Sequence, residues 1–176
     1  MQIEWFNGPR AQLRPLFELA DDSQGQLDEY LNQGRVMVAR VGPELIGHLQ
    51  LIPAHLPGEV ELKSLAVVPA REGQGVGRAL VTTAIETCRA DGWIRMLVST
   101  GAADLGNLRF YQRVGFRMLS IERDAFVPQT GYPGVIMING IQLRDRVWFS
   151  QELLPVDEPL DLAGGPASLD GFSDGV

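Results

Sequence analysis

The stretch that decides the fold is Glu61–Leu80, ELKSLAVVPAREGQGVGRAL. It predicts an apolar strand that ends at Pro69, a loop containing Gly73, Gly75 and Gly77, and then a helix. Because glycine has no Cβ, alternate glycines allow successive backbone N–H groups to point into one concavity. The first turn of the helix adds unpaired N–H groups and the positive end of the helix dipole. The sequence therefore predicts a cradle for a diphosphate group.

Two common diphosphate-binding loops do not fit this spacing. A Walker A loop ends in Gly-Lys-Ser/Thr, whereas Gly77 is followed here by Arg78 and Ala79. The only lysine of the chain, Lys63, precedes the loop. A dinucleotide fingerprint needs the spacing G-x-G-x-x-G, and the three glycines supply it in neither register. The diphosphate therefore belongs to a different kind of ligand.

The same stretch resembles the acetyl-CoA loop of the Gcn5-related N-acetyltransferases, in which a strand ending Ala-Val-x-Pro leads into Gln/Arg-x-x-Gly-x-Gly/Ala. The strand end LAVVP and the loop GQGVGR match this pattern. One position departs from it, because Glu72 stands where the family has Gln or Arg. A carboxylate there would repel phosphate, so the resemblance implies that Arg71, Arg78 or the backbone donors hold the pyrophosphate instead.

A second motif follows at Asn107–Phe116, NLRFYQRVGF. Its apolar spacing predicts a short helix that Gly115 terminates. It is similar to the second motif of the same family, which implies that Asn107 hydrogen-bonds the pantetheine arm and that Tyr111 donates a proton to the departing CoA thiolate. Taken alone, Tyr111 reads as an aromatic core residue; the two motifs together favour the catalytic role. The residues that the resemblance assigns to the acyl donor are Leu65, Ala66, Val67, Gly73, Gln74, Gly75, Val76, Gly77, Arg78 and Asn107.

The order of the predicted elements indicates an α/β (α+β) protein. Strands over 35–41 and 45–52 form a hairpin, a strand over 60–67 enters the glycine loop, and a helix over 75–91 leads to a parallel strand over 93–99. Two further strands are expected near 116–123 and 141–149. This pattern predicts a mixed, mostly antiparallel sheet of about seven strands flanked by helices, which by resemblance is the acyl-CoA N-acyltransferase fold. In that fold the pantetheine arm pairs with the backbone of 65–67.

Amide formation also needs a base, because an amine is protonated at neutral pH. Glu61 lies five residues before Ala66, where histone-modifying members of the family carry their catalytic glutamate. Glu61 is therefore the candidate base, and an ion pair with Lys63 is an equally strong interpretation. Asp104, Ser99 and Thr100 are weaker candidates for the base. Backbone N–H groups at 65–66 are expected to polarise the thioester carbonyl.

Composition narrows the function classes. The 176 residues are 45% hydrophobic, enough for one domain with a proper core. A net charge of −7 argues against nucleic acid as a partner. With two histidines and one cysteine, Cys88, neither a metal site nor a disulfide is expected. Without a long apolar run or a signal peptide, the sequence predicts a cytoplasmic protein with no membrane association.

Two segments stand apart from the predicted domain, which covers residues 1–154. Residues 125–140 form a long connection, expected either as a loop beside the acceptor site or as the surface of a homodimer. Residues 155–176 carry five acidic and no basic side chains and are rich in Gly and Pro, which predicts a flexible tail. In the predicted strand over 45–52, His48 and Gln50 are expected at the surface, or else lining the acceptor pocket.

The sequence thus predicts an acyltransferase (class 2.3.1) of an uncharacterised bacterial subgroup of the family, moving acetyl from acetyl-CoA to a primary amine. The acceptor is expected to be a small molecule or a protein amine. Two other functions remain open: transfer from another acyl-CoA, and a non-catalytic CoA-binding sensor or interaction module. Glu72 and the uncertain base leave room for the second of these, whereas Asn107 and Tyr111 argue against it.

Overall fold

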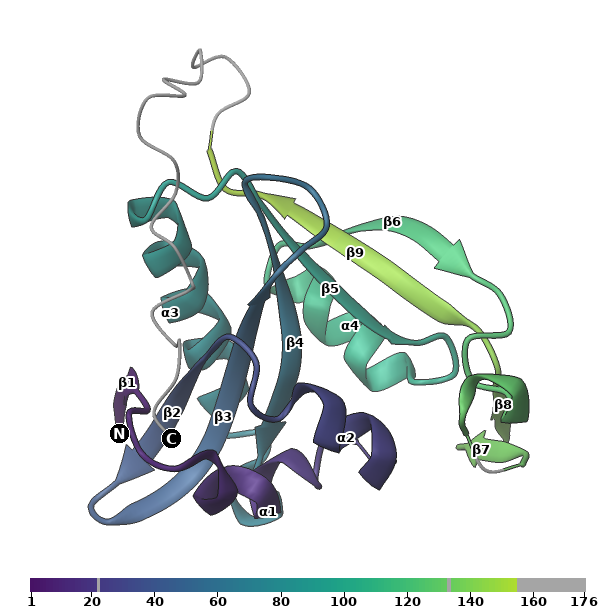
Figure 1. Ribbon diagram of the computed structural model, residues 1–176, viewed down its shortest axis with the longest axis horizontal. Coiled ribbons are helices and arrows are strands. Elements are labelled where there is room, and N and C mark those ends of the chain that lie inside the picture. Colours follow the sequence, from purple (N-terminus) through teal and green to yellow (C-terminus); the bar gives the residue numbers. More distant parts are fainter. Residues whose placement is uncertain (22, 133, 155–176) are drawn as a thin grey trace. The chain divides into compact units, whose positions relative to one another are not determined.

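The computed structural model describes residues 1–21, 23–132 and 134–154 (Figure 1). The predicted tail, residues 155–176, lies outside the described residues. The described residues divide into two compact units, Met1–Met96 with residues 152–154, and Leu97–Gln151. No helix in the described ranges is long and apolar enough to cross a membrane.

The strands of the first unit form an antiparallel array in chain order. They are β1 (Gln2–Trp5), β2 (Arg35–Val41), β3 (Glu44–Pro53) and β4 (Glu59–Val67). Seven consecutive residues of β3, from Ile46 to Ile52, are buried, so this strand is covered on both faces. β4 carries a bulge at Lys63, because the neighbouring residues Gln50 and Leu51 of β3 pair with Ser64 and Leu62.

Helices cover both faces of these strands (Figure 1). They are η1 (Arg10–Leu13), α1 (Arg14–Phe17), α2 (Gln24–Tyr30), η2 (Pro69–Arg71) and α3 (Val76–Ala90). Gly47 allows α3 to come close, since a Cβ there would meet Leu80 Cδ1 at 3.3 Å and Val76 Cγ1 at 3.4 Å. On the opposite face, Phe17 of α1 stacks on His48 with ring centroids 4.1 Å apart. The predicted helix 75–91 is confirmed as α3.

The second unit places a helix beside three strands. Its elements are β5 (Arg95–Gly101), α4 (Leu105–Arg113), β6 (Arg117–Glu122), η3 (Pro128–Thr130), β7 (Ile136–Ile138), β8 (Ile141–Leu143) and β9 (Arg146–Glu152). The strand order is β5-β9-β6, and β7 and β8 form a separate two-stranded hairpin. The aromatic core of this unit contains Tyr111, Phe116 and Phe149, all buried.

Residues 125–149 are more ordered than the sequence indicates. The predicted loop 125–140 contains η3 and β7, and the single strand predicted near 141–149 is divided into β8 and β9. The break lies at Arg144 and Asp145, which both bond to Asp124: Arg144 Nε donates to its carboxylate, and Asp145 Oδ1 accepts its N–H at 2.9 Å. Because these hydrogen bonds join residues about 20 positions apart, no local sequence pattern predicts the break between β8 and β9.

Apart from the separate hairpin of β7 and β8, the first unit has four strands and the second has three. These seven strands agree with the predicted mixed, mostly antiparallel sheet of about seven strands flanked by helices. That prediction of the fold class is therefore confirmed. The glycine loop between β4 and α3 belongs to the first unit, and α4 with the second motif belongs to the second unit.

Candidate functional site

The loop between β4 and α3 has the open backbone that a phosphate cradle requires. Gly73 and Gly75 adopt positive φ angles of 71° and 85°, a conformation that residues with a Cβ rarely adopt. A Cβ added at either glycine would meet no heavy atom within 4 Å, so both face open space. Gly75 is also the N-cap of α3, whose first-turn N–H groups have no carbonyl partner within the helix. The loop therefore fits a pyrophosphate.

The side chains around the loop leave this cradle accessible. Glu72, the residue that departs from the family pattern, is exposed. Arg71 lies 3.7 Å from Glu44 in an exposed ion pair, the kind that contributes little stability and that a better anion can displace. Gln74 Nε2 donates to the Ala70 carbonyl at 2.9 Å, which ties the loop to η2.

The strand end that precedes the loop is fixed from one side. Leu65, Ala66 and Val67 pair with Leu49, His48 and Gly47 of β3. Ala66 is buried, while Leu65 and Val67 are half-buried. The pairing with β3 sets the direction of the peptide groups at 65–67, which are the groups assigned to the pantetheine arm.

Both glutamates of β4 are ion-paired. Glu61, with 15% of its side chain exposed, lies 3.5 Å from Lys63 Nζ. Glu59 accepts from Arg95 at 2.9 Å, and Arg95 also donates to Glu152 at 2.7 Å. The ion pair expected for Glu61 is therefore present, which leaves its role as a base untested. Since each carboxylate has a cationic partner, the two provide less net attraction for a cationic amine than the sequence suggests.

His48 and Gln50 are fully buried, so their expected position at the surface is wrong. His48 Nε2 lies 2.8 Å from Ser64 Oγ on β4. Gln50 Nε2 donates to the carbonyls of Tyr30 and Gln33, both at 2.7 Å, and so holds the C-terminal end of α2. The helices α1 and α2 cover this face of the sheet, which a strand pattern alone does not reveal.

At the N-terminus of α4, Asp104 acts as the N-cap. Its carboxylate accepts the backbone N–H of Asn107 at 2.9 Å and the side-chain amide of Asn107 at 2.8 Å. This gives Asp104, a weaker candidate for the base, a structural role. Asn107 itself is exposed. The cap fixes the side chain that the family resemblance assigns to the pantetheine arm.

One turn further along α4, Tyr111 lies in an aromatic cluster with only 6% of its surface exposed. Its ring centroid is 5.2 Å from that of Phe110, 5.9 Å from Phe116 and 6.0 Å from Phe149. Burial, and secondly the negative charge of Asp104, raise the pKa of the Tyr111 phenol above its ordinary value. The hydroxyl therefore stays protonated at every physiological pH, as a proton donor must before it acts.

Comparison with known proteins identifies the family. The model of the acetyltransferase (GNAT) family matches residues 2–116, about two thirds of the chain. The uncharacterized N-acetyltransferase YvbK of Bacillus subtilis (strain 168) is 35% identical over 147 residues, which cover 84% of this chain and 93% of that protein. The chain belongs to the GNAT acetyltransferase family. The predictions of the family and of an acyltransferase enzyme are thus confirmed.

Solved structures agree with this result. A Bacillus subtilis acetyltransferase in complex with CoA has a TM-score of 0.79 and 35% identity, with 87% of this chain and 99% of that one covered. A GNAT family acetyltransferase from Elizabethkingia anophelis with acetyl-CoA bound has a TM-score of 0.77 and 29% identity, covering 86% and 97%. The predicted acyl-CoA N-acyltransferase fold is confirmed. The roles of individual residues stay predictions.

Sequence reasoning missed two residues near the candidate groups. Ser64 bonds the buried His48, and Arg95 neutralises Glu59. Both contacts join residues that lie at least 16 positions apart in the chain. Polar residues on a strand are the only local signal for either contact, and they fit an exposed strand face equally well.

Proposed function

We propose that this protein transfers the acetyl group of acetyl-CoA to a primary amine by direct attack. The observation that carries the proposal is the loop Gly73–Gly77, with two positive φ angles and open space above both glycines, at the start of α3 in a member of an acetyltransferase family. The CoA complex of the Bacillus subtilis relative supports the choice of donor. Acetyl-CoA is a substrate here, consumed in each turnover.

In the proposed reaction the amine nitrogen attacks the carbonyl carbon of the thioester. The C–N bond forms and the C–S bond breaks, so the acetyl group moves to nitrogen and CoA leaves as a thiolate. Backbone N–H groups at 65–66 polarise the carbonyl oxygen as negative charge develops on it. Tyr111 protonates the thiolate, and Asn107 bonds the pantetheine arm.

Glu61 is the proposed acceptor of the amine proton, directly or through water. With 15% of its side chain exposed, it keeps contact with solvent while Lys63 holds its carboxylate in place.

The Glu61→Gln variant tests this role. We expect kcat to fall by about 100-fold at neutral pH, at the lower end of the effect of removing a general base. The deficit should shrink at high pH, where the free amine is abundant and needs no base. The Lys63→Gln variant is the control, because it breaks the same ion pair but keeps the carboxylate. A pH–rate profile for Glu61→Gln that matches the wild type would remove Glu61 from the mechanism.

Calorimetry with acetyl-CoA tests the donor site. We expect the Gly75→Ala variant to bind acetyl-CoA at least about tenfold more weakly, because the strained backbone shifts the N–H groups that face the phosphates. Gly42→Ala is a matched control, since Gly42 also has a positive φ, of 57°, with no atom near its Cβ position, but lies in the β2–β3 turn. Equal binding by both variants would argue against the cradle, and wild-type binding weaker than millimolar would overturn the proposal.

A panel of amines, with release of the CoA thiol as the readout, tests the reaction. Turnover with at least one small-molecule or peptide amine supports the proposed transferase. Faster turnover with succinyl- or propionyl-CoA than with acetyl-CoA would identify a different acyl group. Tight acetyl-CoA binding without turnover on any amine would favour a CoA-binding sensor instead.

A further inference from the structure

Strand β6 exposes both of its faces. All six of its residues are exposed, and Met118, Leu119 and Ile121 have 57%, 54% and 67% of their surface accessible. It also stands last in the order β5-β9-β6, so within the described ranges no strand pairs with its outer edge. An open edge that carries large apolar side chains is a template for a further strand.

The pairing of β6 with β9 decides which side chains share a face, because cross-strand partners point the same way. Met118 is opposite the buried Phe149, and Ile121 is opposite the buried Val147. Leu119 is the extra residue of a bulge, which shifts the alternation by one. Met118 and Ile121 therefore lie on one face, although they are three positions apart. The other face carries Arg117, Ser120 and Glu122, whose partners are Ser150, Trp148 and Arg146.

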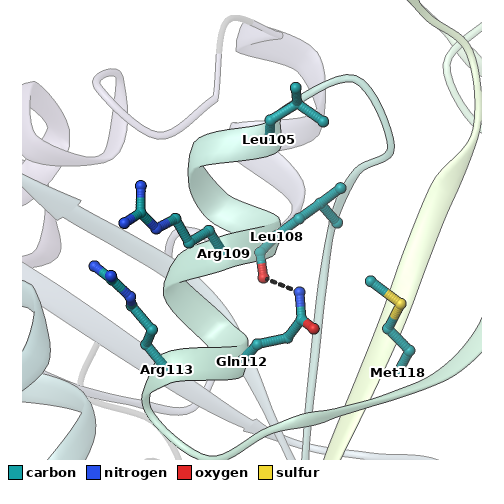
Figure 2. A pocket seen from close by; sticks show the side chains of 6 residues that line it. All are labelled: Leu105, Leu108, Arg109, Gln112, Arg113 and Met118. Carbon is teal, nitrogen blue, oxygen red and sulfur yellow. Dashed lines mark hydrogen bonds between the residues drawn. The ribbon is translucent and has the colours of Figure 1, made fainter.

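A hollow adjoins the apolar face. It has a volume of about 470 Å³, is open to solvent, and is lined by Leu105, Leu108, Arg109, Gln112, Arg113 and Met118. Figure 2 shows Leu105 and Leu108 on the side of α4 toward Met118, whereas Arg109 and Arg113 extend from the opposite side. The wall toward β6 therefore combines two leucines with the amide of Gln112, which donates to the Leu108 carbonyl at 2.9 Å. Leu105 is itself 58% exposed. The exposed apolar surface continues from the strand onto the helix.

The sequence of β6, RMLSIE, is complementary to itself when reversed. If two β6 strands run antiparallel with Met118 of one copy opposite Ile121 of the other, Arg117 comes opposite Glu122 at both ends. The bulge makes this register consistent, because each pair then lies on a common face of the joined strands. Opposite charges face each other directly, and no like charges do. We propose that two copies of this chain form a homodimer by pairing their β6 strands antiparallel in this register.

The pairing satisfies the N–H and C=O groups of two otherwise open edges. It also places Met118 of each copy against Ile121 of the other, which removes part of their apolar surface from water. The hollow beside Met118 gives the apolar side chains of the second copy a place to pack. The charges at both ends of β6 complement those of a second copy of this chain, which favours that copy over an unrelated peptide as the partner.

Sedimentation at micromolar protein concentration tests the dimer. We expect a mass about twice the 19.3 kDa of one chain. Ile121→Asp places a charge opposite Met118 and should weaken dimerisation at least about tenfold. Leu56→Asp is the matched control: Leu56 is 60% exposed but lies in the first unit, so this variant should remain dimeric. Thermal unfolding checks that both variants are folded. A monomeric wild type, or a dimer that survives Ile121→Asp, would overturn the proposal.

Mixing two variants tests the register. Met118→Lys and Ile121→Asp should each sediment as a monomer alone. Together they should form a heterodimer, because lysine at 118 then meets aspartate at 121 and the second pair of that interface keeps its native residues. Failure of the mixture to dimerise while the wild type does would contradict this register.

Discussion

Replacing Tyr111 with phenylalanine should lower kcat by about 100- to 10,000-fold, the range expected when a general acid is lost. Phenylalanine keeps the ring within its cluster of Phe110, Phe116 and Phe149, at centroid distances of 5.2 to 6.0 Å, so the packing of α4 should survive. Only the hydroxyl is removed. The dissociation constant of acetyl-CoA, measured by calorimetry, should therefore change little, and the loss should appear in turnover.

The leaving group provides a second measurement for Tyr111. When the acetyl donor is a thioester of a more acidic thiol, the departing thiolate needs no protonation. The ratio of the wild-type rate to the Tyr111→Phe rate should therefore shrink with such a donor. Tyr30→Phe is the control, because Tyr30 is also a buried tyrosine and donates to Asp21 at 3.2 Å, yet it has no proposed role in the reaction. If Tyr111→Phe keeps more than about a third of kcat, another group protonates the thiolate.

The cofactor-binding half of the candidate site could be predicted because its signal is local. Glycines at 73 and 75 have positive φ angles, and α3 begins at Val76, one residue after the expected start. A turn that only glycine adopts easily, followed by an apolar helix face, appears directly in the residue order. The helix of the second motif is local in the same way, since Asp104 caps it three residues before Asn107.

The environment of β3 could not be predicted, because it depends on contacts between distant residues. Polar residues at 48 and 50 suggest a strand with one solvent-exposed face, yet Ile46–Ile52 are all buried. The partners of His48 and Gln50 are Ser64 and the carbonyls at the end of α2, 16 to 20 positions away. These hydrogen bonds offset part of the cost of burying two polar side chains, since His48 Nδ1 and Gln50 Oε1 have no partner among the described residues. No local pattern encodes the bonds.

His48 should make the protein sensitive to mild acid. Burial, and secondly the positive charge of Arg10, lower the pKa of His48 to about 3 in the folded protein. In the unfolded chain a histidine titrates near pH 6.5. Between these values the unfolded state binds a proton that the folded state does not, so the free energy of unfolding falls as the pH falls from about 6.5 to about 3. The slope approaches about 1.4 kcal/mol per pH unit.

Urea unfolding at a series of pH values measures this effect. Between about pH 6.5 and about pH 5 the wild type should lose about 1.5 kcal/mol of its free energy of unfolding through His48. The His48→Asn variant takes up no proton in this pH interval, so it should lose less stability over it. At neutral pH it should be less stable than the wild type, because the stacking of the His48 ring on Phe17 is lost. The other histidine, His55, is exposed in the loop after β3, and His55→Asn serves as the reference variant for replacing a histidine by asparagine. Equal slopes for wild type and His48→Asn would mean that the folded protein protonates His48, and the burial argument would then be wrong.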